Sequence, residues 1–151
     1  MPYPEQMVAP MRAELVEMGV QELRTTGEVE DFFAVKEGTF LLLINSVCGC
    51  AAGSARPAVG LALGNDRRPD RAATVFAGQD LEATALARDL IGDVPPSSPS
   101  FALMKDGELV HFVPRHLIEG QDAGVVAANL AEAFGAYCST HPKGMDNGDL
   151  S

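Results

Sequence analysis

The pattern of hydrophobic and polar positions alternates along the chain between helical and extended spacing. Apolar residues recur every three to four positions in five segments, which predict helices over 11–18, 25–36, 51–65, 81–91 and 121–137. Continuous apolar runs predict strands over 39–46 and 72–77, and a short strand is expected over 22–24. Two further runs, 101–104 and 109–113, flank an Asp-Gly pair and predict a β-hairpin.

Several helix ends and faces carry signals of their own. Thr25, followed three positions later by Glu28, forms a capping box that opens the second helix. Asp80 is the expected N-cap of helix 81–91, and Pro57 is expected to kink helix 51–65 because it removes a backbone hydrogen bond. The last helix is expected to direct inward the side chains of Val126, Leu130, Ala133, Phe134 and Tyr137.

The order of these elements predicts an α/β sandwich with a mixed central sheet. Strands that are separated by helices pair in parallel, and the hairpin adds an antiparallel edge. Sites in open α/β sheets form where a strand ends and a helix begins. The segment Cys48-Gly49-Cys50 lies at such a junction, directly after strand 39–46.

Length, charge and cysteine content narrow the class of protein. A chain of 151 residues suits one domain, expected over 1–138, followed by a flexible polar tail over 139–151. The net charge of −10 argues against nucleic-acid binding, because the chain would repel phosphates. The sequence lacks a signal-peptide pattern and any apolar run of membrane-spanning length, so we expect a cytoplasmic protein without membrane contact.

The two neighbouring cysteines are the strongest chemical signal in the chain. The N-terminus of a helix lowers the pKa of a thiol, and in a reducing compartment such a pair is catalytic, redox-sensing or metal-binding. The residues alone leave open whether Cys48 or Cys50 attacks. A Cu(I) or zinc site completed by His111, His116 or Cys138 is an alternative, although the second cysteine pair typical of structural zinc sites is missing. Cys138 is otherwise expected to be a packed helix residue.

Three further places are candidate parts of a site. The Ser98-Pro99 bond is either cis, turning the Ser98 backbone towards the cysteines, or part of an ordinary loop. Arg56 either binds a carboxylate of a small thiol or is a solvated surface charge. His116 and Glu119 either shuttle protons or form a structural turn before the last helix.

Several motifs together resemble a known family. The order of cysteines, proline-containing helix, Ser98-Pro99 and hairpin resembles the thioredoxin fold. From about residue 3 to 138 the chain more closely resembles the bacilliredoxins. The motifs that carry this resemblance are Asn45-Ser46-Val47-Cys48-Gly49-Cys50-Ala51-Ala52-Gly53, Ala55-Arg56-Pro57-Ala58, Phe76-Ala77-Gly78-Gln79-Asp80, Pro96-Ser97-Ser98-Pro99-Ser100, His111-Phe112, Pro114-Arg115-His116 and Ile118-Glu119-Gly120.

The resemblance implies a thioredoxin-like α/β/α sandwich and a thiol–disulfide oxidoreductase. Members of the family remove bacillithiol from proteins that carry mixed disulfides, and disulfide isomerase activity has also been associated with them. By this resemblance Cys48 attacks, Cys50 resolves, and Ser98 and Pro99 bind the substrate. No bound cofactor is implied; a low-molecular-weight thiol is the co-substrate, and a recycling thiol or reductase is the further partner. The Cys-x-Cys spacing and the absence of tryptophan separate the chain from ordinary thioredoxins.

Overall fold

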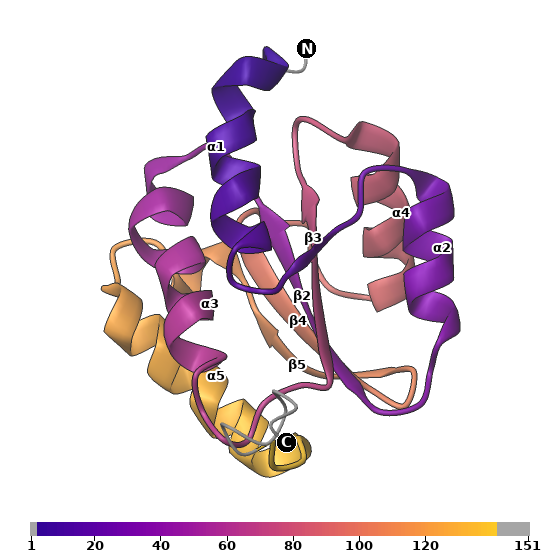
Figure 1. The fold of residues 1–151 in the computed structure, drawn as a ribbon, viewed down its shortest axis with the longest axis vertical. Helices are drawn as coiled ribbons and strands as arrows, with labels where there is room; N and C mark the ends of the chain where they lie inside the picture. The colour runs from indigo at the N-terminus through magenta and orange to yellow at the C-terminus, as the bar shows by residue number, and fades with distance from the viewer. Residues whose placement is uncertain (1–2, 142–151) are drawn as a thin grey trace, which may run out of the picture.

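The structure, a computed structural model, describes residues 3–141 and is built around a five-stranded sheet (Figure 1). The strand order is β1-β3-β2-β4-β5. Strands β1, β3 and β2 pair in parallel, whereas β4 pairs antiparallel with β2 and β5 pairs antiparallel with β4. The strands are β1 (Gln21–Glu22), β2 (Thr39–Asn45), β3 (Arg71–Phe76), β4 (Ser100–Lys105) and β5 (Glu108–Val113). The predicted mixed sheet and its hairpin are thereby confirmed.

Helices cover both faces of this sheet. In Figure 1, α1, α3 and α5 lie on one face, and α2 and α4 lie on the other. The helical segments are α1 (Glu5–Val16), α2 (Thr26–Ala34), the π-helical turn η1 (Ala51–Ala55), α3 (Arg56–Ala62), α4 (Leu81–Ile91), the 3₁₀ turn η2 (Arg115–Leu117) and α5 (Ala123–Tyr137). The predicted α/β/α sandwich is confirmed. None of the helices within 3–141 is long and apolar enough to span a membrane.

Strand β2 is the centre of the core, and all seven of its residues are buried. Leu41 and Leu43 pack in the hydrophobic cluster beneath α3 and α5. Leu42 and Ile44 pack in a second cluster beneath α2 and α4. A strand that is covered on both faces is apolar at nearly every position, which is why its sequence shows no alternation.

The first helix begins earlier than its sequence pattern predicted. Helix α1 runs from Glu5 to Val16 rather than over 11–18, and Pro10 lies inside it. Pro10 is exposed, whereas Val8 and Leu15 are fully buried. We attribute the earlier start to this burial, which compensates for the one backbone hydrogen bond that the proline removes.

The helix after the cysteines is divided rather than continuous over 51–65. A π-helical turn, Ala51–Ala55, precedes α3, which ends at Ala62. Pro57 lies in the first turn of α3, directly after η1; Arg56 N donates to Ala51 O, and Pro57 has no N–H with which to continue this pattern. The irregularity expected at Pro57 therefore takes the form of a π turn just before it.

Two predicted helix starts have different outcomes. The capping box is confirmed, because Thr25 Oγ1 accepts from Glu28 N at 3.2 Å and Glu28 Oε1 accepts from Arg24 N at 2.7 Å. Asp80 occupies the predicted N-cap position of α4, but its side chain makes no capping hydrogen bond there. The Asp80 carboxylate instead accepts two hydrogen bonds from Arg12, at 2.7 and 3.0 Å.

The C-terminal helix differs from its prediction at its last residue. Val126, Leu130, Ala133 and Phe134 are buried as expected, whereas Tyr137 is 36% exposed. The prediction for Tyr137 is therefore wrong. The chain then continues along the α3–β3 connection, where Thr140 forms a β-bridge with Arg67. Residues 142–151, most of the predicted tail, lie outside the described part of the chain.

Candidate active site

The two cysteines lie where β2 ends and the η1–α3 helical segment begins. Both are half-buried free thiols, and Cys48 Sγ lies 2.7 Å from Cys50 Sγ. The backbone N–H groups of Ala51 and Ala52 donate to Cys48 O at 3.1 and 3.2 Å, which closes the turn between strand and helix. Gly49 is exposed between the two thiols. This geometry directs both sulfurs to one point at the edge of the sheet.

Hydrogen bonds favour the ionised form of Cys48. Partial burial disfavours the thiolate, but donors that face the sulfur outweigh it and lower the pKa of Cys48. These donors are the Cys50 thiol, the Ser46 hydroxyl and the backbone N–H groups of Ala51 and Cys50. Ser46 Oγ lies 3.2 Å from Cys48 Sγ.

Cys50 is shifted in the opposite direction. Burial, the hydrogen bond to Cys48 and the charge of Cys48 raise the pKa of Cys50, against a lowering influence of Arg115. One thiolate at this site therefore suppresses ionisation of the other. The residues alone left the order of the cysteines open, and the geometry favours Cys48 as the thiolate.

We therefore predict that iodoacetamide modifies Cys48 before Cys50 at neutral pH. A lowered pKa means that the Cys48 thiolate persists below the pH at which an ordinary thiol is protonated, so its alkylation is lost only at lower pH. Fragment mass spectrometry of the reduced protein would locate each adduct. Cys138 is the internal control, because burial raises its pKa and the folded protein should protect it. Alkylation of Cys50 first would contradict the assignment.

Arg56 is buried behind the site. It is 3% exposed, so the surface-charge alternative is wrong. Its Nη1 donates to Asn45 Oδ1 and to Ser46 O, both at 3.0 Å, and its Nε donates to Glu14 Oε1 at 2.8 Å. These donors are engaged within the protein, so nothing here supports the prediction that Arg56 binds a substrate carboxylate.

The loop before β4 supplies the second side of the site. The Ser98–Pro99 peptide bond is cis as predicted, whereas the predicted turn of the Ser98 backbone towards the cysteines stays a prediction. Ser98 O accepts from Arg115 Nη1 at 3.4 Å, and Ser97 O accepts from Arg88 Nη2 at 3.3 Å. Two arginines from different elements thus hold consecutive carbonyl groups of this loop. Substrate binding by Ser98 and Pro99 stays a prediction.

Arg115 is the functional candidate that the sequence analysis did not single out. It lies in η2, and the charges of Cys50 and Cys48 raise the pKa of its guanidinium. Glu119 pairs with Arg115 at 3.4 Å, and His116 lies exposed on the same 3₁₀ turn. The structural-turn alternative for this segment is therefore observed. Only the motif Pro114-Arg115-His116 pointed to this position, and it assigned no role.

Comparisons with known proteins identify the family. A family model described as disulphide isomerase matches residues 3–138. A bacilliredoxin of Salinibacter ruber is 59% identical over 91% of this chain and 82% of its own length. A bacilliredoxin of Shouchella clausii is 54% identical over 90% of this chain and 94% of its own length. The protein belongs to the bacilliredoxin family.

Solved structures confirm the thioredoxin-like fold of this bacilliredoxin family member. Thioredoxin of Fasciola hepatica superimposes with a TM-score of 0.55 at 20% identity, over 78% of this chain and 99% of its own. A thioredoxin of Schistosoma mansoni gives 0.53 at 20% identity, over 76% and 97%. The family and the fold together are those of thiol–disulfide oxidoreductases.

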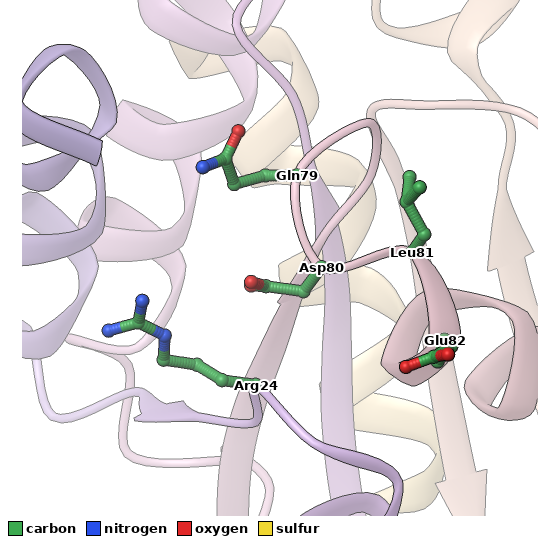
Figure 2. A pocket seen from close by; sticks show the side chains of 5 residues that line it. All are labelled: Arg24, Gln79, Asp80, Leu81 and Glu82. Carbon is green, nitrogen blue, oxygen red and sulfur yellow. The ribbon is translucent and has the colours of Figure 1, made fainter. Parts of the chain in front are cut away.

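Two cavities lie near the ends of the parallel strands. One, of about 440 Å³, shares Arg115 with the cysteine site and has apolar walls that include Phe112 and Pro114. The other, of about 500 Å³, lies at the start of α4 (Figure 2). Its lining includes Arg24 and Asp80 but no sulfur. Neither lining includes a cysteine, and of these two cavities only the first is linked to the cysteine site of this bacilliredoxin family member, through Arg115.

The metal alternative finds little support in the geometry. Within residues 3–141, no three histidine, cysteine or acidic side chains are grouped to hold an ion. His111 Nε2 instead pairs with Asn129 Oδ1 at 2.7 Å. Cys138 faces Thr39, at the opposite end of β2 from Cys48. The third and fourth ligands of a four-coordinate site would therefore have to come from elsewhere.

Proposed function

We propose that this protein removes a low-molecular-weight thiol, such as bacillithiol, from proteins that carry it in a mixed disulfide. The observation that carries the proposal is the pair of free thiols 2.7 Å apart, of which Cys48 has the lowered pKa and Cys50 the raised one. This is the arrangement of an attacking thiolate beside a resolving thiol. The identification of its relatives as bacilliredoxins supports the choice of substrate.

In the first step the Cys48 thiolate attacks the sulfur of the small thiol. A bond forms between Cys48 Sγ and that sulfur, the mixed disulfide breaks, and the client cysteine leaves with the electron pair and takes up a proton from solvent. The cavity of about 440 Å³ is lined in part by Arg115, whose charge acts on both cysteines, and it offers room for the small thiol. Attack on a disulfide within a client protein would instead give isomerase activity.

In the second step Cys50 loses its proton and attacks Cys48 Sγ. The small thiol leaves with the electron pair, and a Cys48–Cys50 disulfide remains for an external thiol or reductase to reduce. Once Cys48 carries the small thiol, the charge and the hydrogen bond that raised the pKa of Cys50 are gone, while Arg115 still lowers it. Loading of Cys48 thereby activates the resolving thiol. The turnover suits the reducing cytoplasm that the sequence predicts.

Mass spectrometry of a Cys50→Ala variant tests this sequence of steps. Mixed with a client protein that carries bacillithiol, the variant should lose its second step and accumulate the small thiol on Cys48. A glutathionylated client in a parallel reaction would show which thiol is preferred. An adduct on Cys138, or a client that keeps its modification, would contradict the proposal.

A further inference from the structure

The hydroxyl group of Ser46 is placed against the reacting sulfur. Ser46 Oγ accepts a hydrogen bond from Cys48 N at 3.2 Å and donates to Cys48 Sγ at 3.2 Å. A hydroxyl that accepts from an N–H is polarised, which strengthens its own donation. Ser46 is buried at the end of β2, so few other partners compete for its proton.

A buried arginine holds this serine in place. The same Arg56 Nη1 reaches Ser46 O and Asn45 Oδ1, and Asn45 Oδ1 also accepts from Ser46 N at 2.9 Å. Glu14, on α1, pairs with the other side of the guanidinium. One planar group therefore holds both the Asn45 side chain and the Ser46 carbonyl.

We propose that Ser46 is a further catalytic residue, which donates a hydrogen bond to the Cys48 thiolate, and that Arg56 is the positioning residue that holds Ser46 there. The proposal rests on the proposed function only in taking Cys48 as the attacking group. Ser46 keeps its proton throughout: the hydrogen bond stabilises the thiolate before attack and again when Cys48 is the leaving group of the second step. Charged or titratable groups around Cys48 are Cys50 and Arg115 at the site, and Arg56 with Glu14 behind it.

The pH dependence of Cys48 alkylation in a Ser46→Ala variant tests the catalytic part. Loss of the hydrogen bond raises the pKa of Cys48, so less thiolate is present at neutral pH. A thiolate of higher pKa is also more nucleophilic. For each tenfold loss of thiolate, the reactivity of the remaining thiolate rises about threefold. We expect alkylation about threefold slower at pH 7 and, on the alkaline plateau, about threefold faster than in the wild type. General damage to the site would slow the reaction at every pH.

Two further serine variants control this experiment. Ser46→Thr keeps the hydroxyl and should restore the wild-type pH profile. Ser54→Ala removes another buried hydroxyl, which bonds Gln121 O from the neighbouring turn and does not touch a sulfur. It should lower thermal stability without shifting the profile. An unchanged profile in Ser46→Ala, or an equal shift in Ser54→Ala, would overturn the catalytic part of the proposal.

A double-mutant cycle tests the positioning role of Arg56. Arg56→Lys keeps the charge but loses the planar group that bonds Glu14 through Nε while Nη1 bonds Asn45 and Ser46. We expect it to shift the profile in the same direction as Ser46→Ala, and to shift it no further in the Ser46→Ala background. Equal shifts in both backgrounds would show that Arg56 acts without Ser46. Alkylation needs no disulfide substrate, so these results stand apart from whether the small thiol is removed.

Discussion

Replacement of Cys48 by serine is expected to abolish removal of the small thiol, with a rate loss on the order of a thousandfold or more. The thiolate is the nucleophile in disulfide exchange, and a serine hydroxyl is essentially never ionised at neutral pH. The measurement is the time course of thiol release from a modified client protein, followed by mass spectrometry. The fold should persist, because Cys48 is half-buried and lies outside both hydrophobic clusters.

Cysteine variants at the other two positions separate the roles. Cys138→Ser changes a buried thiol at the far end of β2 and should leave release intact in protein that remains folded. Cys50→Ala should still complete the first step once per molecule and then stop. Full release by Cys48→Ser, or a complete loss in Cys138→Ser at unchanged stability, would exclude Cys48 as the attacking residue.

The largest stability effect is expected for Arg12→Ala, with a loss of about 3–5 kcal/mol in the free energy of unfolding. Arg12 is 6% exposed and pairs with Asp80, whose side chain is 11% exposed, at 2.7 Å. Its Nε also pairs with Glu5 at 2.9 Å, and its guanidinium lies 5.3 Å from the centre of the Phe76 ring. Removal of the cation leaves the Asp80 carboxylate buried without its partner. Urea unfolding followed by circular dichroism measures the change.

Arg24 offers a matched control for this prediction. It pairs with the same Glu5, at 3.3 Å, but is 45% exposed, so water screens the interaction. Arg24→Ala should therefore change the free energy of unfolding by less than about 1 kcal/mol. Similar losses in the two variants would show that α1 is not held to the start of α4 by the buried pair.

Locally encoded features could be predicted from the sequence with small errors in their bounds. The Thr25–Glu28 capping box and the Asp106-Gly107 turn are examples, because a few neighbouring residues specify each of them. The turn needs positive φ angles, and the structure has 50° at Asp106 and 86° at Gly107. Helix α1 was placed less well, since burial of Val8 against the rest of the molecule overrides the local signal of Pro10.

Features that depend on distant partners could not be predicted. Asp80 is a good N-cap by type, but a buried arginine from α1 competes for its carboxylate and wins. Arg56 was interpreted as a group that faces solvent or substrate because its partners, Glu14 and the end of β2, come from other elements. Tyr137 follows the apolar spacing of its helix, yet the helix has already reached the edge of the core.

The sequence by itself determined the order of helices and strands, the placement of the Cys-x-Cys pair where β2 meets a helix, and the family motifs. These depend on spacing and on neighbours in the chain. Only the tertiary structure favoured Cys48 over Cys50 as the thiolate, because burial, the folded geometry of the turn around the two cysteines and the distant Arg115 together shift the two pKa values. The thiolate of Cys48 is stabilised by Ser46 and by the N–H groups of the helical turn. Arg115, which follows β5 in the chain, acts to lower the pKa of Cys50. The difference between the two sulfurs thus depends on how this turn folds and on one arginine distant in sequence, neither of which the hydrophobic pattern specifies.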